Sequence, residues 1–137
     1  MLTKITVAEV KHVAEMAKAA REARDQILDK IRDQDLGEPT PAKGEHNPAG
    51  LLGLDPLPLD HPVRAALRDS VTALTASARR ELRALLSIGR GDYAAKDWEQ
   101  AVADATTIRD DVTIAMLLEE ADLHQYLMKA LYELRIQ

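Results

Sequence analysis

The sequence predicts an all-α fold, an irregular bundle of five or six helices with a long N-terminal helix. Apolar residues recur at helical spacing through most of the 137 residues, and no segment keeps the strict alternation of a β-strand. Glycine and proline cluster in one stretch, at about residues 36–61. The length suits a single domain over residues 1–137, which buries about two-thirds of its unfolded surface.

The long first helix is predicted over residues 6–35. Thr6 and Glu9 have the spacing of a capping box, in which a hydroxyl and a carboxylate each bond one free backbone N–H. A narrow, alanine-rich apolar seam follows at alternating three- and four-residue steps, so another helix can approach closely. That helix belongs either to the same chain or to a second subunit. In the second case the predicted interface residues are Val13, Ala17, Ala20 and Ile27.

Residues 36–61 are predicted to form a loop, because their prolines and glycines forbid a regular element. The leucines between residues 51 and 59 are too apolar to lie in water together. This part of the loop is therefore expected either to cover the helical core or to dock a partner.

Five further segments share helical apolar spacing, and they cover residues 62–74, 76–88, 95–108, about 111–118 and about 123–134. Asp60 or His61 is predicted to cap the first of these, because Pro62 suits the first turn of a helix. Thr75 is predicted to cap the next.

The segment from Ile88 to Tyr93, Ile-Gly-Arg-Gly-Asp-Tyr, is predicted to reverse the chain between the third and fourth helices. Gly89 is expected to end the third helix in the left-handed conformation, and Asp92 to cap the fourth helix. The residues assigned to this structural turn and the adjoining core are Gly89, Gly91, Asp92, Tyr93 and Trp98.

Arg90 is the turn residue whose role the fold does not require. In a structural interpretation its side chain binds carbonyl groups at the helix end. In the alternative, backbone N–H groups of the turn join Arg90 in binding a phosphate or carboxylate, and the ligand-binding residues are Gly89, Arg90, Gly91 and Asp92. Arg-Gly-Asp is also a cell-adhesion signal, but the opening residues contain no apolar signal segment, so secretion is not expected.

The stretch Leu82–Tyr93 resembles the hallmark of a bacterial domain-of-unknown-function family, number 3775. Later landmarks agree in order and spacing, namely Trp98, Thr113, Leu117, Leu118, Leu123, Tyr126, Leu127 and Leu131. The resemblance covers roughly residues 63–134 and implies a small bacterial helical protein without a known activity. The family has a Gly/Pro-containing turn before its last helix, whereas this chain has Glu119-Glu-Ala-Asp122. The last two helices are therefore expected to join with only a slight bend.

The composition argues against several classes of protein. The chain has no cysteine, which excludes disulfides and thiolate chemistry and suits a cytoplasmic location. Its net charge of −5 disfavours nucleic acid and anionic lipid, and a helix-turn-helix here would present Asp97, Glu99 and Asp104 to phosphates. No apolar run reaches the roughly 18 residues of a membrane span. Glu9 and His12 have the Glu-x-x-His spacing of di-iron bundles, but no second such motif occurs, so no metal site is predicted.

No nucleophile elbow, phosphate-binding loop or dinucleotide fingerprint occurs, so neither a catalytic residue nor a cofactor is predicted. The sequence favours a non-enzymatic interaction or regulatory module that forms a homodimer or binds another protein. The alternative is a small-ligand or anion-binding protein, an enzyme included, that uses the turn Gly89–Asp92 and Arg90.

Overall fold

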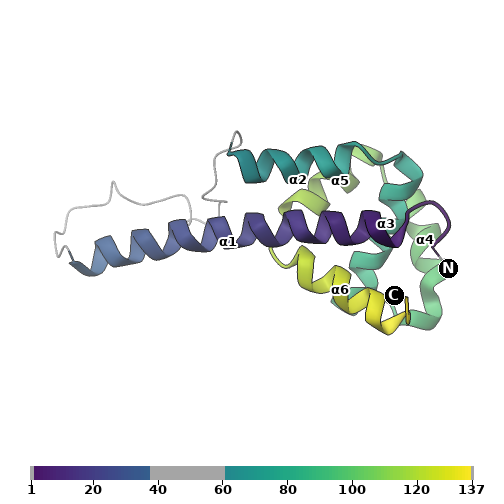
Figure 1. Cartoon of the computed structure of the whole chain (residues 1–137). Coiled ribbons are helices and arrows are strands. Elements are labelled where there is room, and N and C mark those ends of the chain that lie inside the picture. Colours follow the sequence, from purple (N-terminus) through teal and green to yellow (C-terminus); the bar gives the residue numbers. More distant parts are fainter. Residues whose placement is uncertain (1, 38–60, 137) are drawn as a thin grey trace.

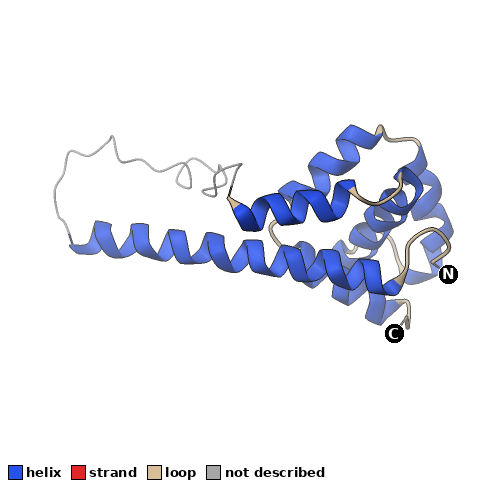
Figure 2. Cartoon of the chain, turned by 45° about the horizontal axis from the view of Figure 1, so that its top comes forward, coloured by secondary structure: helices blue, strands red, loops and turns tan. Residues whose placement is uncertain are grey.

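A computed structural model describes residues 2–37 and 61–136, with the backbone alone over residues 30–37. Figures 1 and 2 show helices, which from residue 62 onward are joined by short turns, and no strand occurs within these ranges, so the all-α prediction is confirmed. The elements in order are α1 (Val7–Gly37), α2 (Pro62–Thr72), α3 (Ala76–Arg90), the 3-10 turn η3 (Ala95–Asp97), α4 (Trp98–Thr106), α5 (Asp110–Glu119) and α6 (Leu123–Glu133). The predicted loop lies outside the described residues over positions 38–60, leucines 51–59 included.

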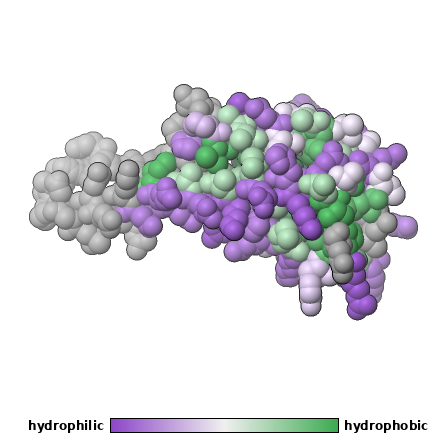
Figure 3. All heavy atoms as spheres, in the orientation of Figure 1, coloured by the Kyte–Doolittle hydropathy of each residue, from purple (hydrophilic) through white to green (hydrophobic). Residues whose placement is uncertain are grey.

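The long helix α1 begins at the predicted capping box. The backbone N–H of Thr6 donates to Oε1 of Glu9 at 2.9 Å, and the N–H of Glu9 donates to Oγ1 of Thr6 at 3.0 Å. The first half of α1 packs between α2 and α6, while its second half extends past the other helices (Figure 1). Its outward face over the bundle is hydrophilic (Figure 3), so the apolar seam is turned inward.

Local caps also fix the starts of α2 and α3. Nδ1 of His61 accepts the backbone N–H of Val63 at 3.2 Å, which identifies His61 rather than Asp60 as the cap of α2. Oγ1 of Thr75 accepts the backbone N–H of Ala78 at 3.0 Å, as predicted. The central helix is α3, which packs against α4, α5 and α6.

The end of α3 differs from the prediction, because Gly89 lies inside the helix and Gly91 ends it. Gly91 is left-handed, with φ +89°, and its N–H donates to the carbonyl of Ile88 at 3.0 Å. The N–H of Asp92 donates to the carbonyl of Ser87 at 2.9 Å, which completes a Schellman motif. Gly89 instead faces α6, where the two backbones approach closely.

The aromatic residues after the turn lie as predicted, but Asp92 does not. Trp98 is buried, and Tyr93 is half-buried against the same core. Asp92 caps no helix, because Ala94 is the N-cap of η3 and makes no side-chain capping bond. The carboxylate of Asp92 forms an ion pair with Arg90 instead.

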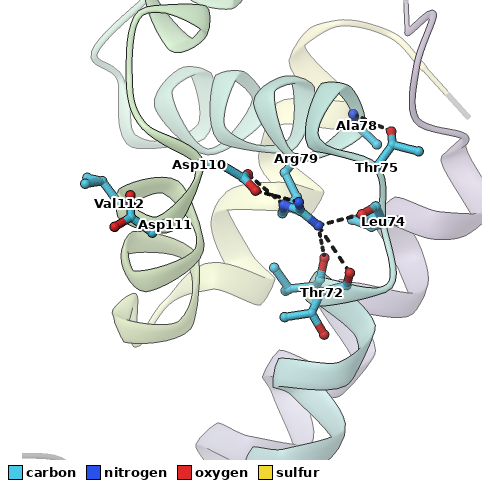
Figure 4. A network of polar contacts seen from close by, with 9 residues as sticks. Thr72, Leu74, Thr75, Ala78, Arg79, Asp110, Asp111 and Val112 are labelled. Carbon is cyan, nitrogen blue, oxygen red and sulfur yellow. Dashed lines mark hydrogen bonds and ion pairs between the residues drawn. The ribbon is translucent and has the colours of Figure 1, made fainter.

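Arg79, which is itself buried, joins α2, α3 and α5 in a polar network (Figure 4). Its Nη1 donates to the carbonyl oxygens of Val71, Thr72 and Leu74, at 3.2, 3.2 and 2.5 Å, which caps the end of α2. Its Nε and Nη2 donate to the two carboxylate oxygens of Asp110 at 2.8 and 2.6 Å. The N-terminus of α5 is therefore anchored to the end of α2.

The expected slight bend between α5 and α6 is wrong. The backbone of Glu120 is extended, with φ −75° and ψ 113°, and this conformation ends α5. Residues 120–122 thus break the helix without a glycine or a proline.

Candidate functional site

A polar pocket of about 510 Å³ lies beside the glycine turn. Its volume falls in the range of small-molecule sites, about 300–1,000 Å³. Its charged and hydroxyl-bearing walls come from α3, the turn, α4 and the loop after α4. The polar residues that define these walls are Arg83, Ser87, Arg90, Asp92, Tyr93, Asp104 and Thr107.

One face of α3 supplies the cationic wall of this pocket. Arg83, Ser87 and Arg90 are spaced by four and then three residues, which places them in one stripe along the helix. Of these three residues, only Arg90 is among the predicted ligand-binding residues. The same spacing, followed back from Arg90 along the polar side of the helix, could have found the other two.

Arg90 contacts two carboxylates and does not bind helix-end carbonyls. Its Nε lies 3.6 Å from Oδ2 of Asp92, and its Nη1 lies 4.0 Å from Oε1 of Glu120. The Arg90 side chain is 39% exposed, and exposed ion pairs of this kind contribute about 0–1 kcal/mol. Arg90 can therefore exchange these partners for a ligand at small cost. The structural role expected of Arg90 is therefore wrong, because the end of α3 is closed by the backbone N–H groups of Gly91 and Asp92.

Arg83 is half-buried and has little to bind within the protein. Its Nη1 lies 3.5 Å from Oγ1 of Thr113, which is a long and weak hydrogen bond. No carboxylate among the described side chains, those of residues 2–29 and 61–136, lies within ion-pair distance of Arg83. A guanidinium carries five N–H donors, so most of its hydrogen-bonding capacity remains available to a molecule in the pocket.

The acidic wall is organised around Asp104 of α4. The hydroxyl of Tyr93 donates to Oδ2 of Asp104, and Nε2 of Gln100 donates to Oδ1 at 2.8 Å. These bonds, that of Tyr93 first, lower the pKa of Asp104 below its ordinary value, so the carboxylate is ionised at neutral pH. The same bond raises the pKa of Tyr93, which therefore remains a hydrogen-bond donor.

Of the four turn residues predicted to bind a ligand, Arg90 and Asp92 line the pocket. Gly89 is buried under α6. The backbone N–H groups of Gly91 and Asp92 donate within the Schellman motif, so they are already satisfied. The side chains of the turn, rather than its backbone, face the pocket.

The predicted interface residues lie mainly in the core of the chain itself. Val13, Ala17 and Ala20 are 1%, 7% and 7% exposed and lie on the part of α1 that packs against α2 and α6. Ile27 is half-buried and packs against the edge of this core. Three of the four positions are therefore not accessible to a second subunit in this conformation.

A second hollow, of about 690 Å³, lies between the N-terminal segment and α4 and is lined in part by Thr3, Lys96 and Trp98. Its buried carboxylate, Glu81, accepts the backbone N–H groups of residues 3–5 at 2.8–3.2 Å. Because these bonds occupy Glu81, this hollow offers fewer free polar groups than the pocket beside the turn.

Glu9 and His12 are exposed on α1, and Glu9 belongs to the capping box. Within the described part of the chain, no three or more His, Asp or Glu residues are grouped so that they could hold a metal ion. No helix in this part is long and apolar enough to cross a membrane.

A family model described as "Protein of unknown function (DUF3775)" matches residues 64–136. The matched region contains α3 to α6 and every residue that lines the pocket beside the turn, and it excludes α1. No curated protein and no solved structure matches the chain.

Proposed function

The chain belongs to the DUF3775 family of proteins of unknown function, and we propose that its family-matched region is a non-enzymatic binding module. Its ligand is a small oxyanion, a carboxylate or a phosphate, held in the pocket beside the glycine turn. The observation that carries this proposal is Arg83, a half-buried cation without a carboxylate partner among the described residues. An opposite charge stabilises a partly buried cation, and a ligand oxyanion supplies one.

The chemistry of the α3 stripe fits an oxyanion. A guanidinium presents paired donors that match the oxygens of carboxylate and phosphate groups. Arg90 adds a second cation two turns from Arg83, and Ser87 offers a hydroxyl between them. Each hydrogen bond to a charged group contributes about 1.5–3 kcal/mol.

Binding is favoured over catalysis by the rest of the lining. No histidine is among the described residues that line the pocket. Asp104 is already engaged by Tyr93 and Gln100, which suits a fixed acceptor better than a group that exchanges protons. We place the module in the cytoplasm, because a chain without cysteine suits a reducing compartment.

The test is a titration of the full chain with inorganic phosphate and with acetate, followed by NMR of the backbone amides. Arg83→Gln removes the charge but keeps an unbranched polar side chain, and it should weaken binding about tenfold or more. Arg68→Gln, on the exposed surface of α2, is the charge-matched control and should bind like the wild type. Equal binding by both variants, or no binding of either anion, would overturn the proposal.

Self-association is a second candidate function, favoured by the course of α1. This helix continues past α2 and α6, so the backbone of its last turns, beyond Ile27, has no cover from the described helices (Figures 1 and 2). Isolated helices of about 12–15 residues or fewer are marginal in water, so a second copy of α1 would stabilise this part.

Light scattering tests self-association directly. We expect a dimer that Ile27→Glu weakens, because Ile27 is the predicted interface residue nearest the projecting half of α1. Glutamate at Ala17 or Ala20 would disrupt the core of the monomer and is not informative. A monomer at high micromolar concentration would contradict a dimer.

A further inference from the structure

The pocket beside the turn contains charges of both signs, and two of them lack a charged partner. Arg90 and Asp92 pair with each other. Arg83 has no carboxylate within ion-pair distance, and Asp104 has no cation within that distance, in the part of the chain that the structure describes. Both line the same pocket, from the neighbouring helices α3 and α4, yet they do not pair with each other.

We propose that the pocket takes a zwitterionic ligand, with its anionic group on Arg83 and its ammonium group on Asp104. This inference rests on the proposed function, since it keeps Arg83 as the oxyanion site and adds a second contact. A molecule with both charges satisfies the two unpaired groups together. A purely anionic molecule would satisfy Arg83 and face the carboxylate of Asp104, which disfavours it.

Asp104 has the capacity for this second contact. An ionised carboxylate offers about four lone-pair positions, and the donors from Tyr93 and Gln100 occupy two of them. Both donors are neutral, so the negative charge of Asp104 is not cancelled. They also hold the carboxylate in place, which prepares it for an ammonium group without further ordering.

The remaining walls of the pocket can also accommodate an uncharged part of the ligand between or beside its two charged groups. Ile108 and Met116 add an apolar surface from the loop after α4 and from α5. The pocket volume of about 510 Å³ leaves room for a side chain on the ligand. The ligand class is therefore a free amino acid or a similarly small zwitterion.

The experiment compares ligands that differ only by an ammonium group. The pairs are glycine with acetate, β-alanine with propionate, and γ-aminobutyrate with butyrate, titrated into the full chain and followed by NMR. The best amino acid of the series should bind at least about tenfold more tightly than its matched carboxylate. This comparison uses the wild-type protein, so it does not depend on the folding of any variant.

Variants then assign the two contacts. Asp104→Asn keeps an acceptor for Tyr93 and should abolish the advantage of the amino acid while leaving carboxylate binding within about twofold. Asp97→Asn, exposed just before α4, is the matched control and should preserve the advantage. Arg83→Gln should weaken both members of each pair.

The outcomes separate this inference from the proposed function. If carboxylates bind through Arg83 and no amino acid binds more tightly, the zwitterion inference is overturned and the oxyanion site stands. If the amino acids bind more tightly but Asp104→Asn retains the advantage, the assignment to Asp104 is overturned. If no ligand shows dependence on Arg83, both proposals fail.

Discussion

Gly89→Ala should destabilise the protein, although alanine is the better helix former. Gly89 lies within α3, and a Cβ added there would lie 2.1 Å from the carbonyl oxygen of Tyr126 in α6. It would also lie 2.7 Å from the carbonyl carbon and 2.8 Å from the Cα of Tyr126. All three atoms are backbone, so no rotamer change can relieve the contact.

The magnitude depends on two opposed effects. Overpacking a close contact costs about 1–3 kcal/mol or more. We expect a cost at the upper end of this range for Gly89→Ala, because the added Cβ meets backbone atoms and because α3 and α6 share the most extensive contact among the described helices. Alanine returns about 1 kcal/mol of helix propensity. We therefore expect a net loss of about 2 kcal/mol in the free energy of unfolding.

Urea denaturation followed by far-UV circular dichroism measures this loss. Gly91→Ala is the matched control, because nothing lies within 4 Å of its added Cβ and only its left-handed φ of +89° opposes the change. That conformation costs about 1–2 kcal/mol for a residue with a side chain. Gly89→Ala at wild-type stability or above would refute the close packing of α3 on α6.

Three further predictions concern stability. Arg79→Met should lower the free energy of unfolding by about 3 kcal/mol, measured by urea denaturation, because it leaves Asp110 and the end of α2 without their hydrogen-bond donor. A loss below about 1 kcal/mol would contradict this role of Arg79. Burial alone would raise the pKa of Glu81, but hydrogen bonds from the N–H groups of residues 3–5 and from the hydroxyl of Thr3 lower it below its ordinary value overall. The stability that Glu81 contributes is therefore present above its unfolded pKa and is lost as the pH falls through the lower folded value. In a plot of the free energy of unfolding against pH, Glu81→Gln should reduce the decline below about pH 4.5. Identical curves for the variant and the wild type would exclude this coupling. Arg135 is left-handed at the end of α6, with φ 59°, so Arg135→Gly should raise the free energy of unfolding by about 1 kcal/mol, and a thermal melt with no gain would exclude strain there.

The helices and most of their caps could be predicted because the interactions that define them are local. The partners in the capping box and caps at Thr6, His61 and Thr75 lie within three residues of one another. The apolar period of α1 is equally clear in the sequence, but it gives no information on which helix covers it. The same seam serves an intramolecular neighbour or a second subunit, and the structure places α2 and α6 against it.

Tertiary contacts determine the features that the sequence did not predict. Gly89 and Gly91 satisfy the same local rule for ending a helix, and only the approach of α6 distinguishes their roles. Arg79 precedes Arg80 in the sequence and gives no local sign of its burial. Likewise, the helical period places Arg83 and Arg90 on one face, but the packing of α4 on α3 determines that Asp104 shares their pocket.

The pocket beside the glycine turn is proposed as the binding site of this domain, and a map of backbone amide shifts tests that assignment. The map is recorded on the full chain at saturating β-alanine. We predict the largest shifts in residues 83–93 and 101–108, with none in the Arg83→Gln variant. Shifts centred on the other hollow, around Thr3 and Trp98, or no shifts at all, would contradict the assignment.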